Sequence, residues 1–136
     1  LSLSSDLVLW TSASKTYAHL MVEKLDPHKS RFISVLTRES CSELELGLFT
    51  KDLSLLGRPL ERVVLLDDSV TSFLMQPYNA IPMTPYFGGA DDRGLPAILP
   101  MLRGLERQTD VRNVLREEFK MQEHLRDVVN KLESAT

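Results

Sequence analysis

The sequence predicts an α/β domain built on a parallel β-sheet that helices cover on both faces. Short apolar segments alternate along the chain with segments whose apolar residues recur at helical spacing. The apolar segments contain too few polar residues for strands with one face in water, so they fit a sheet that is buried on both sides. With 136 residues, of which 43% are hydrophobic, the chain is long enough for one domain and its core.

The first predicted elements are a strand, a helix and a second strand. Residues 7–10 are apolar and run into Thr11-Ser-Ala-Ser14, whose hydroxyl groups suit a helix start because they accept hydrogen bonds from free backbone N–H groups. Residues 15–24 carry apolar side chains at helical spacing, and Asp26-Pro27 ends this helix. Residues 31–37 are again mostly apolar and fit a second buried strand.

The middle of the chain contains the strongest strand signal. Residues 38–50 are polar and irregular, which indicates a loop. Residues 51–56 suit one helical turn that is closed by Gly57. Residues 62–67 form the clearest strand, because they are apolar, β-branched near their start and end in a carboxylate.

The last part of the chain predicts mainly helices. Residues 69–75 suit a short helix and residues 80–83 a last strand, whereas residues 84–94 are rich in Gly, Pro and Asp and indicate a loop. Residues 95–105 suit a helix with apolar side chains turned inward. Residues 110–132 suit one long amphipathic helix, because apolar side chains keep to one side and charged side chains largely to the other.

Composition argues against several classes of protein. A net charge of -3 without a cluster of basic residues argues against a nucleic-acid-binding domain. The single cysteine, Cys41, excludes an internal disulfide framework and a multi-cysteine zinc site. No apolar run approaches the roughly 20 residues that cross a bilayer, so we expect no transmembrane segment in this chain.

Four polar side chains are expected near the carboxyl ends of the predicted strands, where open α/β sheets gather their functional groups. Thr11 follows the first strand, Asp67 and Asp68 follow the strongest one, and Lys51 precedes that strand on the short helical turn. A hydroxyl, an ammonium and two carboxylates can hold a phosphate group and a magnesium ion. Each residue has an ordinary alternative: Thr11 can cap a helix, Lys51 can be a surface lysine, and the aspartates can stabilise a turn. Their order and spacing are more specific than any one of them.

Five segments in this order resemble a known family. They are Trp10-Thr-Ser-Ala-Ser14, Leu25-Asp-Pro27, Leu36-Thr-Arg-Glu-Ser-Cys41, Lys51-Asp-Leu-Ser-Leu-Leu-Gly-Arg58 and Val63-Val-Leu-Leu-Asp-Asp-Ser69. Together they resemble the phosphatase-like domain of the haloacid-dehalogenase superfamily, which includes the small phosphatases acting on the RNA polymerase II tail. The resemblance implies a three-layer Rossmann-type parallel sheet, in which Thr11 binds phosphate, Lys51 steadies it, and Asp67 and Asp68 serve the magnesium site.

The second half of the chain resembles one branch of that superfamily. Gln76-Pro-Tyr-Asn-Ala-Ile-Pro-Met83, Gly88-Gly-Ala-Asp-Asp-Arg93 and Asp110-Val-Arg-Asn-Val-Leu115 are similar to the Tim-fifty receptor of the mitochondrial presequence translocase. This resemblance implies a mitochondrial protein associated with the inner membrane, on its intermembrane-space side. The implied partners are other subunits of an inner-membrane complex and presequence peptides.

The chain departs from the superfamily in a respect that decides its chemistry. Catalysis in the superfamily uses a D-x-D-x-[T/V] motif with an aspartate nucleophile, and no two aspartates of this chain are two positions apart. The strand that carries the motif is absent too, so we expect the sheet to be incomplete at the N-terminus. We expect no catalytic residue in this chain, remnants of a phosphate site at Thr11 and Lys51, and an empty remnant of a magnesium site at Asp67 and Asp68. No cofactor is expected, and Mg²⁺ only if a nucleophile exists upstream.

Two functions remain open. The first is a non-catalytic interaction domain, either of the presequence translocase or as an accessory subunit of another inner-membrane complex. The second is the C-terminal piece of a magnesium-dependent protein phosphatase whose nucleophile lies upstream or on another chain. In both, residues 1–109 are the haloacid-dehalogenase-like domain and residues 110–136 a C-terminal amphipathic helical extension. Because an incomplete parallel sheet leaves backbone groups unpaired, we expect the chain to fold poorly alone.

Overall fold

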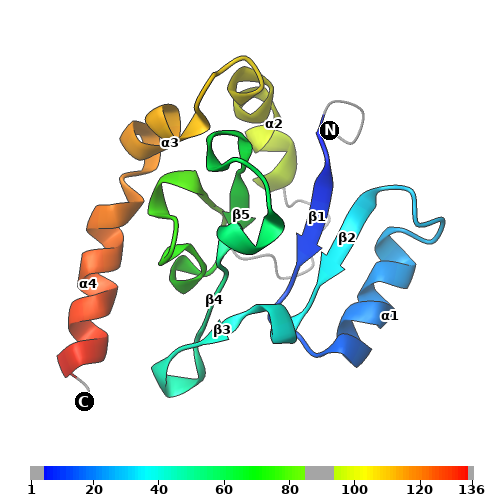
Figure 1. Ribbon diagram of the computed structural model, residues 1–136, viewed down its shortest axis with the longest axis horizontal. Coiled ribbons are helices and arrows are strands. Elements are labelled where there is room, and N and C mark those ends of the chain that lie inside the picture. The colour runs from blue at the N-terminus through cyan, green and yellow to red at the C-terminus, as the bar shows by residue number, and fades with distance from the viewer. Residues whose placement is uncertain (1–4, 85–93, 135–136) are drawn as a thin grey trace. The chain divides into compact units, whose positions relative to one another are not determined.

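The computed structural model describes residues 5–84 and 94–134 of the chain (Figure 1). The chain divides into two compact units, Leu1–Glu43 and Leu44–Thr136, and we describe each unit by itself. The described residues include four α-helices and short strands, some of which pair in parallel. This mixture confirms the α/β class that the sequence predicts.

The first unit contains the expected strand, helix and strand. β1 (Leu7–Trp10) and β2 (Phe32–Leu36) pair in parallel, and α1 (Lys15–Leu25) connects them. Ser14 caps α1, because its hydroxyl oxygen accepts a hydrogen bond from the backbone N–H of Tyr17 at 3.4 Å. The three elements lie close to where the sequence predicts them.

The loop between α1 and β2 is organised by the Asp26 carboxylate, which is buried. The carboxylate accepts hydrogen bonds from the backbone N–H groups of Ser30 (2.9 Å), Arg31 (3.0 Å) and Phe32 (3.2 Å). Burial acts to raise the pKa of Asp26, but these donors and the Arg31 charge hold that pKa below its ordinary value. Asp26 thus fixes the path of the chain into β2.

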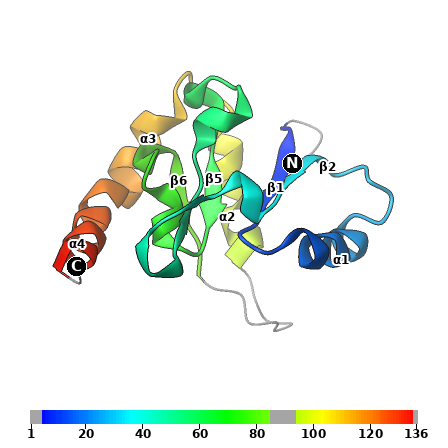
Figure 2. The same ribbon diagram turned by 60° about the horizontal axis from the view of Figure 1, so that its bottom comes forward.

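The second unit contains another parallel pair and most of the helical residues. β5 (Leu65–Asp67) pairs with β6 (Ala80–Pro82), and Figure 2 shows them side by side, with α3 next to β6. The remaining regular elements of the unit are β4 (Phe49–Thr50), α2 (Gly94–Leu105), α3 (Val111–Phe119) and α4 (Met121–Ser134). A two-residue strand, β3 (Ser42–Glu43), ends the first unit.

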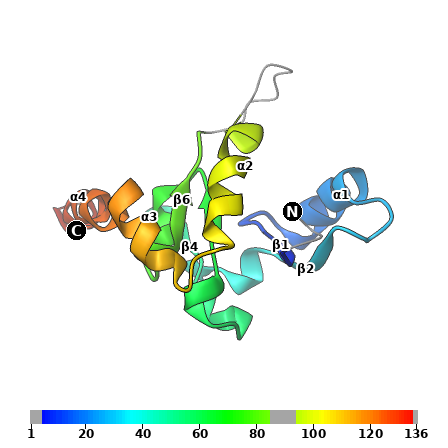
Figure 3. The same cartoon turned by 90° about the horizontal axis from the view of Figure 1, so that it is seen from above.

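Apolar side chains cover both faces of the β5–β6 pair. On one face, Leu66 and Ile81 pack with residues of α2 and α3, which flank β6 in Figure 3: Leu105, Val111 and Leu115. On the other face, Leu65 and Ala80 pack in a second cluster with a buried aromatic side chain and two residues of α4: Phe73, Met121 and Leu125. Successive strand residues point to opposite faces, so this pair is buried on both sides, as the sequence predicts.

The strand expected at residues 62–67 is shorter than predicted. Leu60–Arg62 forms a 3₁₀ turn, and β5 begins only at Leu65, three residues after the last residue of that turn. The reason is a competing partner: the buried amide Nδ2 of Asn79 donates 2.7 Å hydrogen bonds to the carbonyl oxygens of Leu60 and Val63. These carbonyl groups are therefore satisfied by a side chain and not by a neighbouring strand.

The prediction of a single long helix at residues 110–132 is wrong, because the structure has two helices there. Lys120 adopts a left-handed backbone conformation (φ 49°) and separates α3 from α4. On a continuous helix, six residues turn through about 600°, so Met121 would lie about 120° away from the side of Leu115. In the structure both residues are buried. The break at Lys120 therefore allows both helices to bury their apolar sides.

The remaining expectations concern short segments. The 51–56 turn is present as a 3₁₀ turn at Leu53–Leu56, and the helix expected at 69–75 is a 3₁₀ turn at Val70–Phe73. Residues 85–93, which include most of the predicted loop and one segment of the resemblance, lie outside the described residues. Among the helices that the structure describes, none is long and apolar enough to span a membrane.

Candidate functional site

A buried ion pair joins two of the four predicted site residues. The Nζ atom of Lys51 lies 2.5 Å from Oδ2 of Asp67, and their side chains are only 9% and 8% exposed. Lys51 directly follows β4 and Asp67 ends β5, so the pair links two segments of the second unit. Each charge depends on the other, because a buried ammonium or carboxylate without a partner costs several kcal/mol.

Hydrogen bonds close a ring around this ion pair. The other carboxylate oxygen of Asp67, Oδ1, accepts a hydrogen bond from the backbone N–H of Ser69 at 2.9 Å. The hydroxyl groups of Ser69 and Thr71 are 3.0 Å apart, and the Thr71 hydroxyl donates to the carbonyl oxygen of Phe49 at 3.1 Å. Since Phe49 lies two residues before Lys51, the ring returns to the lysine. Both oxygens of Asp67 are thus engaged.

The backbone at Lys51 is held by the segment that follows β5. The Lys51 N–H donates to the carbonyl oxygen of Ser72 at 3.3 Å. The hydroxyl of Thr50 donates to the same carbonyl oxygen, also at 3.3 Å. Thr50, Lys51 and Ser72 are all buried, so these bonds are shielded from water. The position of the lysine therefore depends on tertiary contacts and not on local helix formation.

The two predicted magnesium ligands differ in their surroundings. Asp68 is exposed, and the Asp67 carboxylate already accepts from Lys51 and Ser69. Within residues 5–84 and 94–134, no group of three His, Cys, Asp or Glu side chains could hold a metal ion. Magnesium prefers several oxygen ligands in octahedral geometry, and the nearby ammonium of Lys51 would oppose a second cation. The metal role of Asp67 and Asp68 remains a prediction.

Thr11 lies at the carboxyl end of β1 in the first unit. Its backbone N–H donates to the carbonyl oxygen of Leu36 at 2.9 Å, and its hydroxyl oxygen accepts a hydrogen bond from the Ala13 N–H at 3.1 Å. This bond stabilises the turn that leads into α1, which is the ordinary alternative expected for a threonine here. Its role in phosphate binding remains a prediction.

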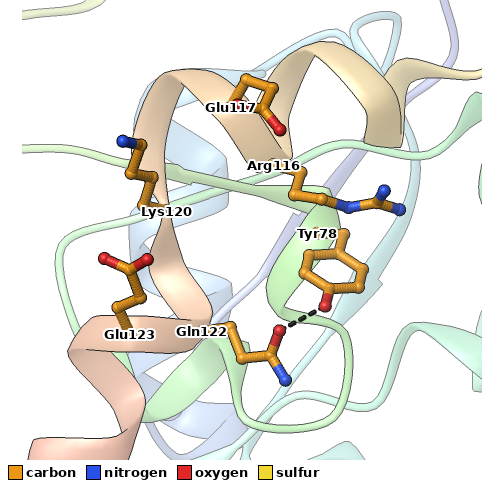
Figure 4. A pocket seen from close by; sticks show the side chains of 6 residues that line it. All are labelled: Tyr78, Arg116, Glu117, Lys120, Gln122 and Glu123. Atoms are coloured by element: carbon orange, nitrogen blue, oxygen red, sulfur yellow. Dashed lines mark hydrogen bonds between the residues drawn. The ribbon is translucent and has the colours of Figure 1, made fainter.

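A shallow pocket of about 310 Å³ lies at the break between α3 and α4 (Figure 4). The Arg116 guanidinium lies 4.3 Å from the centroid of the Tyr78 ring, and the Tyr78 hydroxyl donates to Oε1 of Gln122. One tyrosine thus contacts both helices. Acidic and basic side chains line the pocket together: Arg116, Glu117, Lys120 and Glu123. The sequence patterns did not indicate this pocket, because its residues come from three separate segments.

Comparison with known proteins identifies relatives over most of the chain. Residues 1–112 match the family described as NLI interacting factor-like phosphatase. A protein of Xenopus laevis named CTD nuclear envelope phosphatase 1 is 38% identical over 110 residues, which cover 81% of this chain and 45% of that protein. A protein of Dictyostelium discoideum named CTD small phosphatase-like protein 2 is 34% identical, over 85% of this chain and 20% of that protein.

A further relative is a mitochondrial protein. The protein of Candida glabrata named mitochondrial import inner membrane translocase subunit TIM50 is 38% identical over 113 residues, which cover 82% of this chain and 23% of that protein. The family and the Tim-fifty-like relative agree with the resemblance expected from the sequence motifs. The chain spans less than half the length of each of these three curated relatives.

Proposed function

The chain belongs to the NLI interacting factor-like phosphatase family, and from this premise we propose that it is a non-catalytic interaction domain of a mitochondrial inner-membrane assembly. By resemblance this assembly is the presequence translocase. A close variant of the proposal is that the chain is an accessory subunit of another inner-membrane complex. The proposed partners are other subunits of the assembly, together with presequence peptides. The proposed location is the intermembrane-space side of the membrane.

The Lys51–Asp67 ion pair is the observation that carries this proposal. A phosphate site needs an ammonium that faces the phosphate, and a metal site needs carboxylate oxygens that face the metal. Here each charge already faces the other within one unit, in a place where both are buried. This arrangement favours a fold that is used for its surface.

The mitochondrial part of the proposal is supported by the relative from Candida glabrata. That protein is named as a subunit of the inner membrane import translocase, and its match covers most of this chain. The two segments that carry the Tim-fifty resemblance within the described residues begin at Gln76 and Asp110. These segments contain β6 and the first part of α3, so the resemblance extends beyond the residues of the candidate site.

Purification of the full-length protein from its source tests this function. We expect the tagged protein, after mild detergent extraction of mitochondria, to migrate on a native gel with inner-membrane proteins in fixed stoichiometry. Crosslinking to an arrested precursor during import then separates a translocase subunit from an accessory subunit of another complex. Recovery of the protein as a single soluble subunit, or from the nucleus, would contradict the proposal.

A second function is favoured by the names of the other relatives, several of which are called phosphatases. In this alternative the chain is the C-terminal piece of a magnesium-dependent protein phosphatase, and the nucleophile lies upstream or on another chain. Intact mass and N-terminal sequence of the natural protein distinguish the two functions. A longer protein with an upstream D-x-D-x-[T/V] motif would support the phosphatase, because the nucleophile is the group on which catalysis depends most.

A further inference from the structure

The side chain of Gln76 bridges the two residues that follow Lys51. Its Nε2 donates a 2.8 Å hydrogen bond to Oδ1 of Asp52, and its Oε1 accepts a 2.8 Å hydrogen bond from the backbone N–H of Leu53. One amide thus recognises a carboxylate and a peptide group 24 and 23 residues away along the chain. Both hydrogen bonds are partly buried, and Leu53 is only 2% exposed, so Gln76 is fixed in a single orientation.

Asp52 is held in its charged form by this contact. Its Oδ1 accepts hydrogen bonds from Gln76 and from the backbone N–H (3.0 Å) and hydroxyl (2.7 Å) of Ser54. The Gln76 amide and the two Ser54 donors lower the pKa of Asp52 below its ordinary value, against a smaller opposing effect of burial. Asp52 also caps the 3₁₀ turn that starts at the next residue. The backbone after Lys51 is therefore rigidly defined.

The backbone before Lys51 is fixed by the same segment of the chain. The Ser72 carbonyl oxygen accepts hydrogen bonds from the Lys51 N–H and from the Thr50 hydroxyl. Residues 72–76 thus hold the chain immediately before and immediately after the lysine. A lysine side chain has four rotatable bonds, and its ammonium reaches a defined point only where the backbone is defined. Here that point is the Asp67 carboxylate.

We propose that Gln76 is a positioning residue for Lys51: its amide clamps Asp52 and the Leu53 peptide, and thereby directs the Lys51 ammonium into the site. The inference goes beyond the proposed function and rests on the contact of the Lys51 ammonium with Asp67. It gives a physical role to the first residue of the Gln76–Met83 segment, which carries part of the family resemblance and does not belong to the ion pair. Asn79, a buried polar residue of the same segment, instead donates to the carbonyl oxygens of Leu60 and Val63, which precede β5.

Acylation of lysines in the full-length protein, within its native assembly, tests this role. Mass spectrometry of peptides measures the modification of Lys51 relative to the exposed Lys131 of α4. Loss of hydrogen bonds to a charged group changes a local equilibrium by about tenfold, so we expect Gln76→Met to raise the relative modification of Lys51 by roughly that factor. In Gln76→Glu two carboxylates face each other, and we expect at least the same rise.

An exchange of the two partners provides the specific control. In the double variant Gln76→Glu with Asp52→Asn, the acid and the amide change places, and we expect Lys51 to return close to its original reactivity. Asn79→Ala serves as the structural control, because it loosens the same unit at a different point. Because Lys131 is already exposed, we expect Asn79→Ala to leave its modification unchanged and to raise the ratio less than Gln76→Met does.

Three outcomes would overturn the inference: an unchanged ratio in Gln76→Met, an equal change of the ratio in Asn79→Ala, or no recovery in the double variant. If Gln76→Met does not assemble, the comparison of Gln76→Glu with the double variant still decides the question. These ratios are read on the protein itself and do not depend on the identity of a partner. Failure of this inference is thus distinguishable from failure of the proposed function, which is read from co-purification.

Discussion

The ammonium of Lys51 and the carboxylate of Asp67 meet at 2.5 Å although 16 residues separate them in the sequence. Both side chains are almost completely buried, and the carboxylate has a second donor in the Ser69 N–H. A buried pair of this kind adds less to stability than its contact distance implies, because both charges lose their hydration. Removal of only one member is expected to cost more, since the remaining buried charge then loses its opposite charge.

Lys51→Met is therefore expected to destabilise the second unit by about 3–5 kcal/mol, because it leaves the buried Asp67 carboxylate without its cation. The double variant Lys51→Met with Asp67→Leu is expected to recover most of this loss. The urea midpoint of unfolding, read from protease sensitivity of the purified full-length protein, measures both. The exposed pair of Lys15 and Glu39 offers the matched control, and Lys15→Met is expected to cost at most about 1 kcal/mol. Equal effects at both lysines would contradict the role of burial.

Asn79→Ala is expected to lower the free energy of unfolding by about 2 kcal/mol or more. The variant leaves the carbonyl oxygens of Leu60 and Val63 without their side-chain donor in a buried place, and each unsatisfied group costs about 1–3 kcal/mol. Urea unfolding measures the change. Asn113→Ala on the exposed side of α3 provides the control, and it is expected to be nearly neutral.

Lys120→Gly is expected to raise the free energy of unfolding by about 1 kcal/mol, because glycine adopts the left-handed conformation at this position without the cost that a β-carbon brings. Lys131→Gly, in the regular part of α4, is expected to lower it by about the same amount. Thermal unfolding of the two variants tests the break between α3 and α4. A loss of stability in Lys120→Gly would indicate one continuous helix at this point.

Asp110 is expected to make stability depend on pH at the start of α3. Its carboxylate accepts hydrogen bonds from the Arg112 guanidinium and backbone N–H, and these contacts, with the guanidinium first, hold the pKa of Asp110 below the ordinary 3.8. The contribution is fully present above that value and is lost as the pH falls through the lowered pKa. Urea midpoints of Asp110→Asn and the wild type are thus expected to converge in acid. The exposed Asp127→Asn is the control.

The sequence located β1, β2, β5, β6, α1 and α2 because their signals are local, whereas it gave no sign of β3 and β4. Apolar runs mark β1, β2 and β6, and Ser14 and Asp26 mark the ends of α1 through their hydrogen bonds with nearby backbone groups. The order of Lys51 and Asp67 around the strongest strand placed them at one site, and the structure brings these two together. Their expected roles toward phosphate and magnesium remain predictions.

The features that the sequence did not predict all depend on contacts between distant segments. Asn79 shortens β5 from a position after that strand, and nothing in the 62–67 segment signals it. The break at Lys120 follows from the burial of Met121, yet the apolar spacing before and after it also fits one helix. Gln76 carries no periodic signal, and its role becomes apparent only when Asp52 and Leu53 lie beside it.

The most direct test of the proposed function is the magnesium-dependent hydrolysis of a small aryl phosphate by the full-length protein purified from its source. If Lys51 and Asp67 serve mainly each other, we expect no hydrolysis above the level of a buffer control, and no difference between the wild type and Asp67→Asn. Hydrolysis that requires Mg²⁺ and disappears in both Lys51→Met and Asp67→Asn would show instead that these residues complete a working phosphatase.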